Sequence, residues 1–291
     1  MAVTSPSVRA APLNLRRLLA RAPLIFGVVL LLFYLLFPFY WAIVSSLKTS
    51  NQLFATPVSY LPATPQWQNY LTIFTSQPFG RFLLNSLLVA GGTTVISLVL
   101  GVFAAYAIGR FQFRGRLPIY YVMLAVTMFP SISVLGGLFV LIRSIGLYDT
   151  VAGLIFSYMI FTLPFTIWIL TSFVREIPIE LEESAFIDGA TPVQALFKVL
   201  LPMIAPGMVT AGLLAFIQAW NEFLFALTFS VNENSRTVPV AIALFSGSSS
   251  FELPWNQIMA ASVVVTLPLL ILVLLFQNRI VAGLTAGAVK G

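Results

Sequence analysis

Long apolar runs separated by short polar or basic connections dominate the chain. A membrane-spanning helix needs about 20 predominantly apolar residues, and each run is close to that length or longer. The pattern therefore predicts an all-α, polytopic membrane protein with six transmembrane helices. The runs are 24–44, 83–109, 118–142, 151–174, 203–229 and 258–276.

These runs divide the chain into an N-terminal segment, 1–23, a membrane domain, 24–276, and a C-terminal tail, 277–291. A cleaved signal peptide usually has an apolar core of about 7–15 residues followed by small residues. The first run is longer, and aromatic residues stand at 39–41. We therefore expect it to be retained as a span.

Composition supports a membrane environment. Hydrophobic residues make up 59% of the chain and charged residues 8%, whereas soluble domains carry about 25% charged residues. The absence of Cys and His excludes disulfides, thiolate chemistry and His-based metal sites or acid–base catalysis. The net charge of +6 reports membrane topology, so no nucleic-acid partner is expected.

Basic residues predict the orientation, because Lys and Arg are enriched in cytoplasmic connections. With a cytoplasmic N-terminus, eleven of them lie inside and four outside. Both termini are therefore predicted to be cytoplasmic. The outside connection 49–80 is short and apolar, and we expect it on the membrane surface. The four outside residues are Lys48, Arg81, Arg143 and Arg236.

Prolines and small residues modify individual spans. Pro130 and Pro164 interrupt the third and fourth runs, as is typical of a pathway, a hinge or simple packing. Gly101, Ala105 and Gly109 share one helix face and permit close helix contact. That contact is either packing within the chain or a subunit interface.

The connection 176–202 breaks the charge pattern. It is predicted to be cytoplasmic, yet it carries five of the nine acidic residues: Glu176, Glu180, Glu182, Glu183 and Asp188. Lipid-binding surface helices are usually basic, because the cytoplasmic leaflet is anionic. A protein partner with a basic-rimmed hydrophobic groove therefore fits this connection better than lipid.

Two short helices and a turn are predicted here. Pro178 starts the first helix, and Gly189 ends it by accepting a positive φ. Thr191, Pro192 and Gln194 form the start of the second, with a capping box. Pro202 ends it before the fifth span. An apolar stripe follows the second helix at Val193, Leu196, Phe197 and Leu200.

The segment from Glu183 to Ala190, followed by Leu201-Pro202, resembles the EAA loop of bacterial ABC-importer permeases. The family pattern is Glu-Ala-Ala, three residues, Gly, nine residues, Ile, any residue and Leu-Pro. Ser184 and Val199 depart from it conservatively. Residues 220–223 resemble a helix of carbohydrate-specific permeases, and 278–291 resemble the tail of MalG-type subunits of maltose and trehalose transporters.

The resemblance implies a type I ABC-importer permease in a bacterial or archaeal cytoplasmic membrane, without an enzymatic site. It implies a second, homologous permease, two cytoplasmic ATPase subunits and an extracellular sugar-binding protein as partners. ATP and Mg²⁺ would bind the ATPase, and this chain has no GxxxxGK[ST] motif. The cargo would be a di- or oligosaccharide such as maltose or trehalose.

The resemblance also assigns contacts with the ATPase. In the family the EAA loop is the coupling element, and Glu183 would pair with a basic residue of the ATPase. The coupling residues are Glu182, Glu183, Ala185, Asp188, Gly189, Ala190, Phe197, Leu201 and Pro202. The tail would supply a second contact through Thr285, Gly287, Val289 and Lys290.

A candidate substrate pathway lies in the fifth span. Glu222 is the one acidic residue deep within a predicted span, where charge is expensive and usually faces a cavity or a partner. Gln218, Asn221 and Glu222 share a helical face, and Trp220 and Phe225 are near enough to stack on a sugar. The alternative is a hydrogen bond that locks two helices together.

An ion-coupled secondary transporter is the main alternative, and a membrane scaffold or sensor is another. A secondary transporter ordinarily shows several intramembrane ionisable residues or an inverted repeat. This sequence shows one such residue and no obvious repeat. The acidic loop without a signalling domain argues against the scaffold or sensor.

Overall fold

The computed structural model describes residues 15–245 and 253–286, and the regular elements in these stretches are all helices. The all-α class is therefore confirmed. In chain order the elements are α1 (Leu15–Ser46), α2 (Ser50–Leu53), α3 (Gln68–Ser76), α4 (Phe79–Arg110), α5 (Arg116–Thr127), α6 (Ser131–Ser144), α7 (Val151–Glu176), α8 (Glu180–Ile187), α9 (Pro192–Ala195), the π-helical turn η1 (Leu196–Leu200), α10 (Leu201–Trp220), α11 (Leu224–Phe229), α12 (Val238–Ala243) and α13 (Trp255–Ala286).

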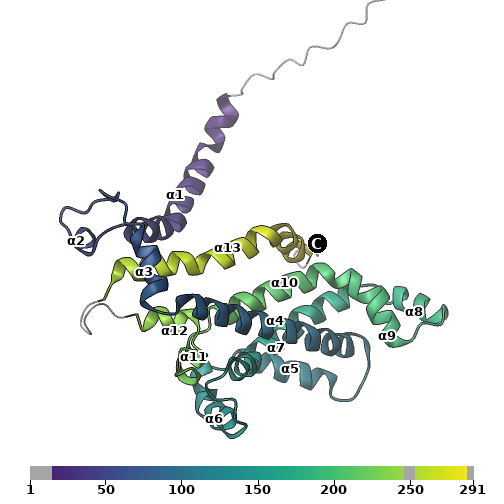
Figure 1. The fold of residues 1–291 in the computed structure, drawn as a ribbon. Coiled ribbons are helices and arrows are strands. Elements are labelled where there is room, and N and C mark those ends of the chain that lie inside the picture. Colours follow the sequence, from purple (N-terminus) through teal and green to yellow (C-terminus); the bar gives the residue numbers. More distant parts are fainter. Residues whose placement is uncertain (1–14, 246–252, 287–291) are drawn as a thin grey trace, which may run out of the picture.

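Five helical segments in the described part of the chain are long and apolar enough to cross a membrane, and α5 with α6 forms a bent sixth candidate. Helices α4, α7 and α10 pack against one another, with α13 beside α10, while α1 extends away from this body (Figure 1). The short helices α8 and α9 lie at one end of the body, and α2, α3, α11 and α12 lie toward the other (Figure 1).

The third predicted span, 118–142, is divided into two helices at Pro130, where the sequence predicted an interruption. Helices α5 and α6 meet at an angle of 101°. Pro130 caps α6 in an extended conformation, with φ −60° and ψ 126°. Proline lacks an N–H and disfavours helical geometry at the preceding residue. The chain therefore leaves the helical path at Phe129 and Pro130 and starts a new helix.

The start of the fifth predicted span, 203–229, also needs correction. The membrane-length segment begins at Pro192, because α9, η1 and α10 follow without a break. Pro202 was predicted to end the preceding helix, but it lies in the first turn of α10. In the widened turn before it, the Leu201 N–H donates to the Leu196 carbonyl. This shifted bonding pattern lets the helical path continue through a proline that has no N–H to donate.

The end of that span is different as well. Helix α10 ends at Trp220 and α11 starts at Leu224, so the predicted helix is broken near its outer end. The Glu222 carboxylate accepts hydrogen bonds from the backbone N–H groups of Phe225 (2.8 Å) and Ala226 (3.1 Å). A side chain that satisfies free N–H groups favours a new helix start.

The small-residue face of α4 packs inside the chain. An added Cβ at Gly109 would stand 2.5 Å from Val174 Cγ1, and one at Gly101 would stand 3.0 Å from Thr166 Cγ2. Ala105 is fully buried between these two positions. Of the two readings of this face, the structure shows the intramolecular one, with α7 as the neighbour.

The connection 49–80 has a folded framework that includes α2 and α3. The Asn69 amide donates to the carbonyls of Ser46 (2.8 Å) and Lys48 (3.1 Å), and it accepts from Asn256 (3.1 Å). These bonds tie the end of α1 to α3 and to the start of α13. The expected position of this connection on the membrane surface stays a prediction.

Candidate functional site

The acidic connection 176–202 stands beyond the ends of α4 and α7 (Figure 1). Its first helix, α8, carries Glu180, Glu182 and Glu183 in its first turn. Carboxylates are favourable there because the helix dipole and the free N–H groups present positive charge. The local sequence therefore accounts for α8, whose start at Glu180 is close to the position that Pro178 predicted.

Gly189 ends α8 as predicted, with φ +87°. The Gly189 N–H donates to Phe186 O (3.0 Å), and the Ala190 N–H donates to Ala185 O (2.9 Å). This pair of bonds is the Schellman motif, which satisfies the last carbonyls of a helix and requires a left-handed residue. Glycine takes that conformation without a Cβ penalty.

The second arm starts as the sequence predicts. The Gln194 N–H donates to Thr191 Oγ1 (3.3 Å), and the Thr191 N–H donates to Gln194 Oε1 (2.9 Å), so the capping box is complete. This arm is not a separate surface helix, however. It continues through η1 into α10, so the predicted helix-turn-helix is α8, a turn and the end of a span.

The predicted apolar stripe on the second arm is divided between two environments. Leu196 and Leu200 are buried in a core with residues of α4 and α7. Val193 and Phe197 are 61% and 49% exposed. The body of the molecule covers one edge of the stripe, because α4 and α7 pack on that side alone, and the other edge stays open.

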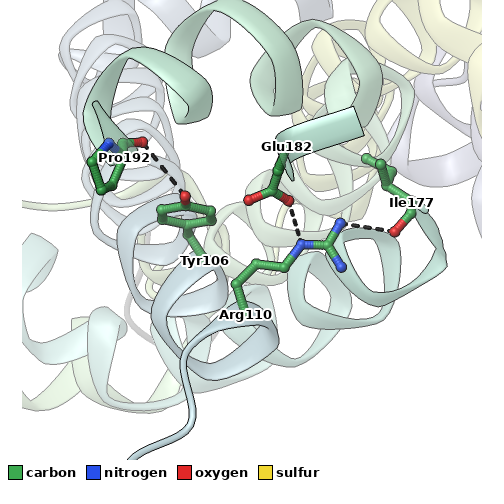
Figure 2. A network of polar contacts seen from close by, with 5 residues as sticks. All are labelled: Tyr106, Arg110, Ile177, Glu182 and Pro192. Carbon is green, nitrogen blue, oxygen red and sulfur yellow. Dashed lines mark hydrogen bonds and ion pairs between the residues drawn. The ribbon is translucent and has the colours of Figure 1, made fainter. Parts of the chain in front are cut away.

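Figure 2 shows how α4 holds this connection. The Arg110 guanidinium, at the end of α4, forms an ion pair with Glu182 of α8. It also donates from Nη2 to the carbonyl of Ile177, which caps α7, at 2.8 Å. One turn earlier, the Tyr106 hydroxyl donates to the carbonyl of Pro192 at 3.5 Å. The last turns of α4 thus contact both arms of the connection.

Burial separates Glu182 from the other acidic residues of the connection. Its side chain is 3% exposed and that of Arg110 is 9% exposed. The sequence grouped Glu182 with the residues that meet a partner, but its carboxylate is directed to α4. Arg110 and Tyr106 were not identified as site residues. A basic residue at the end of a long apolar helix is ordinarily explained by membrane orientation. The sequence gives no sign that Arg110 contacts Glu182, which is 72 positions away.

The outward face of the connection combines charge and apolar surface. Glu183, Asp188 and Gly189 are exposed, while Ala185 and Ala190 are half-buried. Ile187 is 86% exposed, and its neighbours Phe186 and Leu181 are exposed as well. Contiguous exposed apolar surface marks interaction sites. We call the connection 176–202 the coupling loop, after the role that the resemblance implies. Its outward face comprises the exposed residues Leu181, Glu183, Phe186, Ile187, Asp188, Val193 and Phe197.

The candidate pathway residues do not share one helical face. Gln218 and Asn221 are exposed, and the Asn221 amide donates to Ile217 O at 2.8 Å. Glu222 lies in the break between α10 and α11 and caps α11. Trp220 and Phe225 are 2% and 1% exposed and lie in the core with parts of α4 and α7.

A polar cluster at the opposite end of the body was not identified from the sequence. Asp149, at φ +59°, accepts hydrogen bonds from the N–H groups of Val231 (2.9 Å) and Asn232 (3.1 Å) and from the Ser235 hydroxyl. Burial alone raises the pKa of Asp149. The bonds from Ser235, Asn232 and Val231 outweigh it, so the pKa lies below its ordinary value. Asp149 therefore holds the connection after α11 against the start of α7.

The C-terminal residues that the resemblance assigns to a second ATPase contact lie at the end of the described part of the chain. Thr285 falls in the last turns of α13, whereas Gly287, Val289 and Lys290 lie outside the described residues. No group of three or more His, Cys, Asp or Glu side chains arranged for a metal ion occurs in the described ranges.

Comparison with known proteins identifies relatives over nearly the full length. The chain is 48% identical to the trehalose transport system permease protein SugB of Mycobacterium tuberculosis, covering 89% of this chain and 93% of the relative. It is 42% identical to the trehalose/maltose transport system permease protein MalG of Thermococcus litoralis, covering 94% and 98%. It is 43% identical to the sulfoquinovosyl glycerol transport system permease protein SmoH of Agrobacterium fabrum, covering 88% and 89%.

A solved structure shares the fold. It is a chain of a bacterial ABC transporter that imports the acidic polysaccharide alginate, with a TM-score of 0.77 and 20% identity over 92% of this chain and 99% of that one. The family model described as "binding-protein-dependent transport system inner membrane component" matches residues 97–285, which include the whole coupling loop. The chain therefore belongs to the family of binding-protein-dependent transport system inner membrane components, the membrane permeases of ABC importers, as the coupling loop predicted.

Proposed function

We propose that this chain is one of two permease subunits of an ATP-driven importer that carries a di- or oligosaccharide, such as maltose or trehalose, across the cytoplasmic membrane. The relatives named for trehalose and for trehalose and maltose support this class of cargo. The relative named for sulfoquinovosyl glycerol shows that similar chains accompany other sugar-containing cargo. The proposed cargo rests on similarity to these relatives, and the proposed ATPase contact rests on the exposed residues of the coupling loop.

The observation that carries the proposal is the outward face of the coupling loop. It combines the exposed carboxylates of Glu183 and Asp188 with the exposed apolar side chains of Ile187 and Val193, at the end of the packed helices. A basic-rimmed apolar cleft complements such a surface in both charge and hydrophobicity. In this proposal the cleft belongs to a cytoplasmic ATPase subunit, and Glu183 meets its basic rim.

The transport cycle follows from that contact. ATP and Mg²⁺ bind the two ATPase subunits, and this chain supplies neither a cofactor site nor a catalytic group. Closure of the ATPase pair would displace both coupling loops and bias the permease pair between inward-open and outward-open states. The tail, through Thr285, Gly287, Val289 and Lys290, would be a second contact with the ATPase.

The extracellular partner in the proposal is a sugar-binding protein. One solved alginate transporter that shares this fold, with a TM-score of 0.65, is described in complex with a pentasaccharide-bound periplasmic protein. The permease partner is a second, homologous chain, which would complete the sugar pathway. On this chain, the exposed amides of Gln218 and Asn221 are the pathway groups best placed to reach a sugar hydroxyl.

Co-purification from cells that express the neighbouring genes tests the proposal. We expect the chain to bring down an ATPase subunit and a second permease, and the reconstituted complex to hydrolyse ATP faster when its sugar-loaded binding protein is added. Uptake competition among maltose, trehalose and other oligosaccharides then identifies the cargo. If the chain alone carried sugar down an ion gradient and bound no ATPase, it would be a secondary transporter and the proposal would be wrong.

A further inference from the structure

One acidic residue of the coupling loop is attached to the body of the protein and does not belong to the outward face. Helix α8 has one buried residue, Glu182. The other acidic residues of the loop, Glu176, Glu180, Glu183 and Asp188, are exposed. One carboxylate of five is therefore directed inward, and it meets the guanidinium at the end of α4.

The two arms of the loop are attached to the body differently. The second arm, η1, shares an apolar core with α4 and α7 through Leu196 and Leu200. Helix α8 has no comparable apolar anchor, because Leu181, Phe186 and Ile187 are exposed. Among the other helices, α8 contacts α9 and η1 most extensively, and both belong to the loop itself. The Arg110–Glu182 ion pair is the buried charged contact that joins α8 to α4.

Arg110 also determines where that contact is made. Its Nη2 donates to Ile177 O at the end of α7, so the guanidinium is held between α7 and α8. A guanidinium donates in a fixed plane, and two contacts in that plane fix its orientation. Buried ion pairs are retained in some proteins because they specify one arrangement of the parts they join.

We infer that the Arg110–Glu182 pair is the mechanical link between α8 and the membrane-spanning helix α4, so that α8 and α4 move as one body when the ATPase displaces the loop. The inference rests on the proposed function, since it assigns the route by which motion leaves the docking surface. Arg110 and Glu182 are positioning residues that act through α8, and neither contacts sugar or nucleotide.

Distances between α8 and α4 test the rigid link directly. The chain has no cysteine. Cysteines introduced at the exposed positions Glu180 and Val99 would therefore be the only sites on this chain that take a spin label. We expect a narrow distance distribution that is the same without nucleotide and with ATP bound. A distance that changes on ATP binding would overturn the inference, whatever the variants below show.

Variants test whether the pair transmits motion. Glu182→Gln removes the charge while keeping the shape, and we expect it to broaden the label distribution and to lower sugar uptake per ATP hydrolysed by about tenfold, within the usual range of coupling between sites. Glu180→Gln, on the same helix but exposed, is the matched control and should leave this ratio unchanged. Exchanging the partners, Arg110→Glu with Glu182→Arg, should restore part of the ratio.

The outcomes separate this inference from the proposed function. Full coupling in Glu182→Gln, with ATPase bound and hydrolysis stimulated, contradicts the link and leaves the importer assignment standing. If the wild-type chain bound no ATPase, the importer assignment itself would fail. If Glu182→Gln did not assemble, the wild-type label distances would still decide whether α8 and α4 move together.

Discussion

Gly189 shows what a single residue contributes to the coupling loop. Its φ of +87° is in the left-handed region, and an added Cβ would meet no atom within 4 Å. Replacement is therefore opposed by backbone strain and not by lack of space. The left-handed conformation costs a residue with a side chain roughly 1–2 kcal/mol, and β-branched residues suffer most.

We expect Gly189→Val to abolish sugar uptake while the protein still inserts into the membrane, because the turn between α8 and α9 would open. Uptake assays and immunoblots of the membrane fraction measure the two effects. Gly189→Asn is the control, since Asn tolerates the left-handed region better than other residues with side chains. Normal uptake by the Val variant would contradict the role of this turn.

Asp149 acts at the other end of the body, and its effect depends on pH. Its pKa is lowered in the folded chain. The bonds it accepts therefore contribute stability above the ordinary Asp value of about 3.9, and this contribution is lost as pH falls below that value through the folded pKa.

We expect Asp149→Asn to lower the unfolding temperature of the detergent-solubilised protein at pH 7, by an amount that reflects roughly 1–3 kcal/mol of lost charged hydrogen bonding. Asn keeps the positive φ available, so the change removes the charge and one acceptor oxygen without altering the backbone. The difference from wild type should shrink as the pH is lowered toward 3. The exposed Asp188→Asn is the comparison variant, and an equal loss there would show that Asp149 has no special role.

Among the elements, α4 and α7 determine how close the spans lie. Val174 is fully buried, and its β-branched side chain has little freedom to move away from Gly109. An added methyl group at Gly109 must therefore displace one of the two helices. Gly91 lies on the same helix, and a Cβ there would contact nothing within 4 Å.

We expect Gly109→Ala to destabilise the protein by about 1–3 kcal/mol, as overpacking does in a dense interior. Gly91→Ala should be neutral or slightly stabilising, because alanine favours helices over glycine. Thermal unfolding of the purified protein measures both changes. The double variant Gly109→Ala with Val174→Ala should recover stability, and failure to do so would place the cause elsewhere than this contact.

Element by element, the sequence predicted what depends on local chemistry. The capping box at Thr191 and the left-handed turn at Gly189 were confirmed, since each is encoded by neighbouring residues. The bend at Pro130 was underestimated, and the break at Glu222 was missed. Hydropathy records how apolar a run is, and it cannot show whether a helix continues through a proline or is restarted by a side chain.

For the whole molecule, assembly depends on the outward face of the coupling loop. Glu183 is exposed and is not tied to any group within the described residues by an ion pair. We expect Glu183→Lys to abolish transport while leaving membrane insertion intact, because a lysine would repel the basic rim proposed for the ATPase cleft. Pull-down of the ATPase and uptake by membrane vesicles measure the effect. Glu180→Lys is the matched charge reversal, and equal loss from both would show that net charge alone matters.

The membrane environment, the six apolar segments and the capped acidic loop could all be predicted from the amino-acid sequence. These features follow from composition, from runs of apolar residues and from contacts between near neighbours in the chain. The family followed from residues in the same loop, because its motif lies within about 20 neighbouring positions, 183–202.

How the loop is held against the body depends on the tertiary fold. It directed Glu182 inward to Arg110, exposed Val193 and Phe197, buried Trp220 and Phe225, and placed the small-residue face of α4 against α7. Neighbouring carboxylates such as Glu182 and Glu183 are chemically alike, and about 100° of helical rotation separates them. Which one is buried depends on where α4 ends in space, and that position is set by packing between residues far apart in the chain.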